Sequence, residues 1–376
     1  MKPYLSLLLA LTSLALCGCG GLQGEAYEVE QLRVLQVIGL DQAPGGIRLS
    51  LAAAPEADPS GEALCLAADG PDIPRALSRV REQSTEEELF CGHLKQLVVG
   101  ESLARQGIEP VLSYVARSAD LRLDMPLFLL KDGQAADLMA ADYGAKGVTD
   151  LLEAAQTRLE RRRGAPVFTV RDLYRSLIRS GSGAVWALEL QEAAEADGEK
   201  PLLTAAPVGL ALFRDQRLIG FADMDQSLGL CLLMGRVGIW QLSVRDRFGR
   251  EAVLELQEGE TALEPEFDRD GVFRSLKVSA RVRASVAECP VGADPRSPAY
   301  ARELTELLES EISRRIGAAL ALMAQEQADP AGVGSRLERL APGKISGAFP
   351  LPEDLSLSVS VQGHLENSSD IGEAGL

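Results

Sequence analysis

The chain has 376 residues, a formal net charge of −17, 46% hydrophobic residues and only 5% aromatic residues. This length is sufficient for two or three domains, with cores built mainly from Leu, Ala and Val. The strong excess of acidic residues argues against binding to nucleic acid and against direct adhesion to anionic lipid headgroups.

The N-terminus is predicted to be a lipoprotein signal peptide, residues 1–18. Residues 5–16 form an apolar run that is too short to cross a bilayer as a helix with a rise of about 1.5 Å per residue. The run ends in Leu-Cys-Gly-Cys, which matches the lipobox pattern, in which a small residue precedes the lipidated cysteine. Cys17 is the rival acceptor, but it would place the bulky Leu16 at the cleavage position. We therefore predict lipidation of Cys19; the alternative is an ordinary secretory signal that ends by chance near two cysteines.

Lipidation would attach the whole chain to a membrane. Two or three acyl chains, such as palmitate, hold a protein on a bilayer where one chain does not, because each buried methylene contributes about 0.8 kcal/mol. Residues 19–31 are then a polar lipidated tether, and no later apolar run is long enough to span a membrane. We expect the body of the protein on the outer face of the cytoplasmic membrane.

Residues 32–200 are predicted to form an N-terminal domain, because strand and helix patterns alternate along them. Residues 54–71 are rich in Pro, Asp, Gly and Ala and are predicted to be a loop. The acidic stretch 192–200 marks a hairpin loop or a domain edge. The expected strands are 34–41, 47–53, 89–100 and 127–130, and the expected helices are 72–88, 101–107, 108–116 and 149–163.

The second half of the chain is predicted to contain a middle domain, 205–258, and a C-terminal domain, 259–364. The middle domain opens with a hairpin pattern, followed by a short helix that Gly235 ends. In the C-terminal domain, apolar and polar residues alternate over 277–286, which is typical of a strand with one solvent-exposed face.

A long helix is predicted to begin at Ser297, with an apolar stripe that continues to Met323 and packs on the preceding sheet. A last strand, 355–361, follows, and residues 365–376 are expected to be a disordered tail. The pattern as a whole predicts an α+β (mixed α/β) fold with mixed and antiparallel sheets and one long C-terminal helix on a sheet.

The cysteines outside the lipobox are Cys65, Cys91, Cys231 and Cys289, and none is in a CxxC pair. This spacing supports neither a zinc site nor a thioredoxin-like redox motif. Isolated cysteines among apolar neighbours are more often buried free thiols than disulfide partners, although three disulfide connectivities are open. No cofactor is expected apart from the covalent lipid.

No pattern typical of catalysis or metal binding is found. The histidines are His93 and His364, and the sequence contains no GxSxG, HExxH, Walker-type or GxGxxG motif. The carboxylates of Gly39-Leu-Asp41 and Asp223-Met-Asp225 are interpreted as turn and cap residues. The sequence therefore favours binding or assembly over catalysis.

A charged cluster, Arg117, Asp120 and Arg122, lies ahead of the strand expected at 127–130. It can bind a carboxylate of a ligand or a partner protein. The alternative, which we favour, is an internal ion-pair network that fixes the loop.

Short motifs follow one another in a fixed order over almost the whole mature chain. They are the lipobox ending at Cys19, Val37-Ile-Gly-Leu-Asp41, Gly92-His-Leu-Lys95 with Val98-Val-Gly-Glu-Ser-Leu-Ala104, the Arg117/Arg122 spacing, Val208-Gly-Leu-Ala-Leu-Phe213 with Arg217-Leu-Ile-Gly220, and Ala328-Asp-Pro-Ala-Gly-Val-Gly334. Together these motifs resemble the Ger(x)C-type spore germination lipoproteins, the C subunits of nutrient germinant receptors. Two departures are Gly20-Gly21, where the family usually has Trp-Asp, and Gly347-Ala-Phe349, near a common Trp position.

The resemblance implies a three-domain protein on the outer face of the spore inner membrane, where it works with the membrane-embedded A subunit and the transporter-like B subunit of the receptor. It also implies that the protein is needed for nutrient-triggered germination and that it has no catalytic residues. The resemblance does not specify the nutrient. The candidate residues for a partner or ligand are Lys95, Arg117, Asp120 and Arg122.

Two other functions are alternatives to this one. A solute-binding lipoprotein that serves a transporter would show two similar lobes around an aromatic-lined cleft; the low aromatic content and the lack of an internal repeat argue against it. A lipid-anchored hydrolase would need a nucleophile and a base, and the sequence offers no such pair.

Overall fold

The computed structural model of the protein describes residues 32–53, 65–84, 88–141, 147–162, 165–197, 200–345, 351 and 355–366. The predicted signal peptide, the tether with Cys19 and the tail from residue 367 onward lie outside the described residues.

The N-terminal part contains β1 (Leu32–Ala43), β2 (Gly46–Ala53), β3 (Cys65–Gly70), β4 (Glu88–Phe90), β5 (Gln96–Gly100), β6 (Leu127–Leu130), β7 (Ser182–Asp197), β8 (Lys200–Arg214) and β9 (Arg217–Ala222). Its helices are α2 (Ile73–Gln83), α3 (Glu101–Gln106), α4 (Glu109–Arg117), α5 (Ala135–Ala140), α6 (Val148–Thr157), the π-helical turn η3 (Arg158–Arg162) and α7 (Val170–Ser180). The C-terminal part contains α8 (Met224–Met234), β10 (Trp240–Arg245), β11 (Glu251–Phe267), β12 (Phe273–Glu288), α9 (Pro298–Glu326), α10 (Val333–Leu340) and β13 (Ser356–Glu366).

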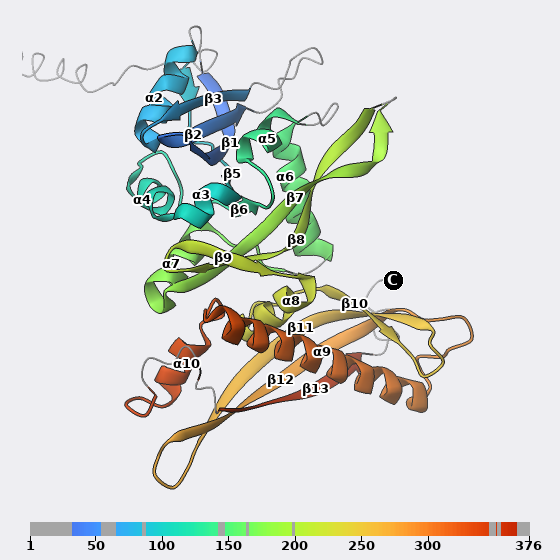
Figure 1. Ribbon diagram of the computed structural model, residues 1–376. Helices are drawn as coiled ribbons and strands as arrows, with labels where there is room; N and C mark the ends of the chain where they lie inside the picture. Colours follow the sequence, from blue (N-terminus) through green and yellow to red (C-terminus); the bar gives the residue numbers. More distant parts are fainter. Residues whose placement is uncertain are drawn as a thin grey trace, which may run out of the picture.

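The larger sheet joins strands from the whole N-terminal part in the order β3-β2-β1-β5-β6-β7-β8-β9, with β4 beside β1 (Figure 1). The strands β1, β5, β6 and β7 run parallel, whereas β2 and β3 at one side and β8 and β9 at the other run antiparallel to their neighbours. Every residue of β5 and β6 is buried. Continuous apolar runs are typical of parallel strands that are covered on both faces, which explains why these short segments form the centre of the sheet.

Asp41 connects β1 to α5. Its buried carboxylate accepts hydrogen bonds from the first backbone N–H groups of the helix, at 2.7 Å from Ala135 and 2.8 Å from Ala136. Burial raises the pKa of Asp41, while these hydrogen bonds act in the opposite direction. A Cβ at Gly100 would lie 2.0 Å from Asp41 Oδ1, so a residue without a side chain is required there. Asp41 is thus a helix cap, as predicted, and so is Asp223, which accepts a hydrogen bond from Gln226 at the start of α8.

The smaller sheet has the order β10-β11-β12-β13, and α9 packs on one of its faces (Figure 1). The apolar residues of β12, such as Val278 and Val282, are buried, and the polar residues between them lie on the other face. The predicted stripe of α9 is buried from Leu304 to Met323, except for Leu307, which is half-buried. The α+β fold with a long C-terminal helix on a sheet is therefore confirmed.

The two sheets are joined through α8, which packs against α9 and contacts β8, β9 and β11. Side chains also cross between the two parts. Arg214 of β8 donates to the carbonyl oxygen of Glu326 at 2.8 Å, and Arg236 lies 3.4 Å from Asp172 of α7. Arg336 of α10 donates to the carbonyl oxygens of Leu233 in α8 and Thr261 in β11, within the C-terminal part. Arg214 and Arg236 therefore link the two parts, whereas Arg336 links three elements of the C-terminal part.

Several predicted boundaries were wrong. Residues 65–70, expected in a loop, form the edge strand β3, because the backbone of β2 supplies hydrogen-bond partners that their composition does not reveal. The helix expected over 149–163 ends at Thr157 and continues as η3, and the helix α5 was not predicted. The last strand extends to Glu366, two residues into the segment expected to be a tail.

The predicted middle domain, 205–258, contributes to both sheets: β8 and β9 belong to the larger one, and β10 and the start of β11 belong to the smaller one. The division into three domains stays a prediction. Among the cysteines, Cys65 is exposed, Cys91 and Cys231 are buried, and Cys289 is half-buried; all four are free thiols.

Candidate binding site

A cleft of about 760 Å³ lies where β5 and β6 begin, with the second half of α6 as its opposite wall. Two of the four candidate residues line it. Lys95 directly precedes β5, and Arg122 lies in the loop before β6. The complete lining is Gly92, His93, Leu94, Lys95, Gln96, Arg122, Asp124, Met125, Pro126, Glu153, Gln156 and Thr157.

Each cation of the cleft is paired with a carboxylate. Lys95 Nζ lies 2.8 Å from Glu153 Oε1 and so connects the start of β5 to α6. Arg122 donates to both oxygens of Asp124, with distances of 3.0 and 2.8 Å. The hydrogen bond from Arg122 lowers the pKa of Asp124, so this carboxylate is ionised at neutral pH. Because all four side chains are about half exposed or more, these pairs are screened by solvent and can exchange partners.

The other two candidate residues lie outside the cleft. Arg117 is the last residue of α4, and its side chain is exposed, as is that of Asp120. The backbone N–H of Asp120 donates to Ser118, and the carboxylate that binds Arg122 belongs to Asp124 and not to Asp120. The structure thus brings together Lys95 and Arg122, and the role of all four residues stays a prediction.

Gln96 is a residue of the cleft that the sequence analysis missed. It is the first residue of β5, it lines the cleft and it is only 2% exposed. Its Oε1 atom is buried and has no hydrogen-bond partner among the described residues. Leaving a buried acceptor unpaired costs about 1–3 kcal/mol, so such an atom requires an explanation. The signal in the sequence was a polar residue at the start of the otherwise apolar strand QLVVG.

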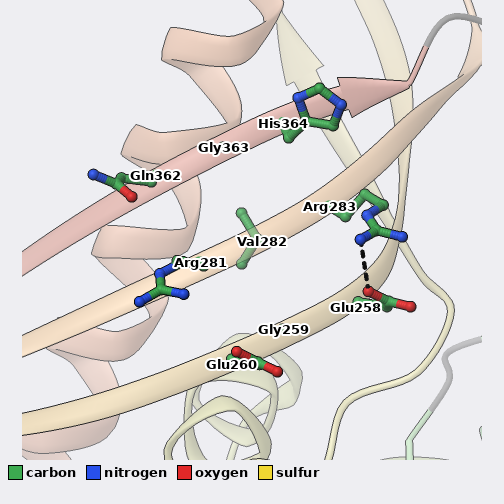
Figure 2. Close-up of a pocket in the computed structure, with 9 residues that line it drawn as sticks. All are labelled: Glu258, Gly259, Glu260, Arg281, Val282, Arg283, Gln362, Gly363 and His364. Carbon is green, nitrogen blue, oxygen red and sulfur yellow. Dashed lines mark ion pairs between the residues drawn. The ribbon is translucent and has the colours of Figure 1, made fainter.

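A second hollow, of about 450 Å³, lies on the outer face of the smaller sheet (Figure 2). Gly259, Val282 and Gly363 are register partners across β11, β12 and β13, and their backbone forms its floor. The two adjacent rows are polar: Glu258 with Arg283 and His364 on one side, and Glu260 with Arg281 and Gln362 on the other.

This groove is open and internally balanced in charge. Arg283 lies 3.4 Å from Glu258 and 3.5 Å from Glu366, so its charge is shared between two carboxylates. The last strand was expected to end at residue 361, before His364, whereas the structure places His364 within β13 next to Arg283. Only the pairing of β13 with β12 could reveal this row.

No helix in the described part of the chain is long and apolar enough to cross a membrane. No group of three or more His, Cys, Asp or Glu side chains there is arranged to hold a metal ion.

The geometry defines a mixed α/β protein of two sheets with open, polar, charge-balanced hollows. The family model described as the N-terminal domain of spore germination protein matches residues 25–189, and the model described as spore germination B3/GerAC-like, C-terminal, matches residues 208–368. The chain belongs to the Ger(x)C (GerAC-like) family of spore germination proteins, as the sequence motifs predicted.

Two individual proteins are similar to this chain. A protein of Bacillus subtilis (strain 168), provisionally named spore germination protein YfkR, is 24% identical over 279 residues, which cover 72% of this chain and 69% of that protein. The crystal structure of the GerBC protein superposes with a TM-score of 0.55 and 16% identity, covering 88% of this chain and 97% of that chain. At this identity the structural likeness establishes the fold.

Proposed function

We propose that this protein is a lipid-anchored subunit of a spore germinant receptor, needed for nutrient-triggered germination, and that it acts by binding and assembly. The observation that carries the proposal is the match of both GerAC family models, in order, to a chain with a lipobox pattern at residues 16–19. The proposed partners are the membrane-embedded A and B subunits, and the proposed location is the outer face of the spore inner membrane.

The anchor supplies the membrane affinity in this proposal. A net charge of −17 opposes direct adhesion to an anionic bilayer, so the lipid on Cys19 has to hold the body in place. Anchoring also raises the effective concentration of the body near membrane partners, and weak contacts with them are then occupied.

A role without catalysis is supported by the chemistry of the two hollows. Their charged side chains pair with one another, as Lys95 does with Glu153 and Arg283 with Glu258. Catalysis needs a positioned nucleophile or a proton-transfer group with a tuned neighbour. The solute-binding alternative expects two similar lobes, whereas the two sheets here differ in strand number and strand direction.

The test is a deletion strain complemented with the parent gene, with Cys19→Ala or with Cys17→Ala, in a host that lacks other germinant receptors. We expect the deletion to abolish germination on a nutrient mixture and to lower the levels of the A and B subunits. Cys19→Ala should release the protein from the membrane and show part of this defect, whereas Cys17→Ala should behave as the parent.

Mass spectrometry of the mature N-terminal peptide gives an independent readout, because it locates the lipid directly. An unmodified Cys19, or a lipid on Cys17, would refute the anchor. Normal germination and normal partner levels in the deletion strain would refute the receptor role.

A further inference from the structure

We propose that the cleft between α6 and the starts of β5 and β6 binds a small zwitterionic molecule, which carries one carboxylate and one ammonium group. This inference goes beyond the proposed receptor role, because binding to the cleft requires neither the lipid nor the partner subunits.

The first argument is the unpaired oxygen of Gln96. Its Oε1 atom is buried at the cleft and lacks a hydrogen donor among the described residues. The terminal amide torsion of glutamine has a broad energy well, so the amide can rotate to present this oxygen to a donor in the cleft. An ammonium group is such a donor, and its hydrogen bonds to carbonyl oxygens are stronger than those of neutral donors.

The second argument is the arrangement of charge. Lys95 lies before β5 and is paired with the carboxylate of Glu153. Arg122 lies before β6 and is paired with the carboxylate of Asp124. A ligand carboxylate that replaces Asp124 on Arg122 leaves the carboxylate of Asp124 free. A ligand ammonium then compensates that carboxylate, so with a zwitterion Arg122 and Asp124 each keep an oppositely charged partner. A ligand with a single charge would break this pair and leave one of the two groups without a partner.

The third argument is size. A volume of about 760 Å³ lies within the range of roughly 300–1,000 Å³ that is typical of small-molecule sites. Leu94, Met125 and Pro126 add apolar surface to the lining, which suits a compact side chain on the ligand. The dimensions and the chemistry together fit a free amino acid.

The experiment uses the mature lipoprotein in detergent micelles, with the standard amino acids as probes in saturation-transfer NMR and calorimetry. For each amino acid that binds, the amine without the carboxylate and the acid without the ammonium group serve as single-charge probes. We expect at least one amino acid to bind and both single-charge probes to bind at least about tenfold more weakly.

Gln96→Leu removes the amide at nearly constant volume, and Arg122→Gln removes the cation at the exposed rim. Each should weaken binding at least about tenfold, whereas Arg117→Gln, outside the cleft, should not. Arg122→Gln keeps the test valid even if Gln96→Leu fails to fold. The proposal is overturned if no amino acid binds, or if binding survives both cleft substitutions.

Failure of this inference is distinguishable from failure of the proposed function. Binding is measured on the isolated protein, and the receptor role is measured by germination and partner levels in spores.

Discussion

The helices α8 and α9 meet where Gly229 lies against the carbonyl oxygen of Arg315. A Cβ at Gly229 would lie 2.1 Å from that oxygen, so the two backbones can approach this closely only with glycine at this position. The side chain of Arg315 returns to α8, where Nη2 lies 2.9 Å from Asp225. This contact joins the helix of the smaller sheet to the helix that packs under the larger one, so it connects the two halves of the protein.

Gly229→Ala should destabilise the protein. The methyl group would overlap the backbone of α9, and overpacking of this kind costs about 1–3 kcal/mol. Urea unfolding followed by circular dichroism measures the change.

Gly317→Ala is the matched control on the partner helix. A Cβ at Gly317 would have no neighbour within 4 Å, and alanine is favoured over glycine inside a helix by up to about 1 kcal/mol. This variant should therefore be more stable than the parent. Equal effects of the two substitutions would show that the contact between α8 and α9 is looser than described.

The ion cluster at this contact should weaken in acid. Burial alone would raise the pKa of Asp225, but hydrogen bonding to Arg314 and the charge of Arg315 hold it below its ordinary value of 3.8. The hydrogen bond from Arg314 lowers the pKa of Glu311 below its ordinary value of 4.5. Because the unfolded chain then binds protons more readily, the contribution of the cluster is present above these ordinary values and lost as the pH falls through the lowered ones.

Chemical denaturation at a series of pH values, for the parent and for Asp225→Asn with Glu311→Gln, measures this dependence. The double variant should lose less stability between about pH 5 and pH 3 than the parent does. Parallel curves for the two proteins would contradict the prediction.

The free cysteines should differ in reactivity toward maleimide in the folded protein. Burial raises the pKa of the Cys231 thiol to about 12, so the reactive thiolate is nearly absent at neutral pH, and the side chain is also inaccessible. Cys65 is exposed and should be labelled first. Peptide mapping after a short reaction, with a denatured sample as the reference, reads out each site; labelling of Cys231 before Cys65 would be the contrary result.

Arg122→Ala should leave the melting temperature within about 2 °C of the parent, because an exposed ion pair contributes little to stability. Arg117→Ala, at an exposed helix end, should behave in the same way. Copurification of the partner subunits tests assembly with the same variants. A large loss of melting temperature would instead show that Arg122 and Asp124 fix the loop before β6.

The sequence alone revealed the elements whose pattern is local. Local patterns indicate which face of an element is buried, because side chains repeat every two residues on a strand and every 3.6 on a helix. Examples are the apolar run of β6, the alternation along β12 and the apolar stripe of α9. The hairpin turn at Asp215 and Gln216 and the end of α8 at Gly235 are likewise local, since they depend on backbone conformations with positive φ. The family followed from short motifs in a fixed order.

Only the tertiary structure decided which strands are neighbours and which distant residues share a cleft. The strand β3 exists because β2 pairs with it, and β13 lies parallel to β12 although a long helix separates them in the chain. Lys95 and Arg122 share a cleft because β5 and β6 are adjacent and parallel, so their starts meet at one edge of the sheet. The unpaired oxygen of Gln96 depends on the burial of this residue where β5 begins. Strand register and long-range packing depend on all the surfaces that meet at once, and no single stretch of sequence records them.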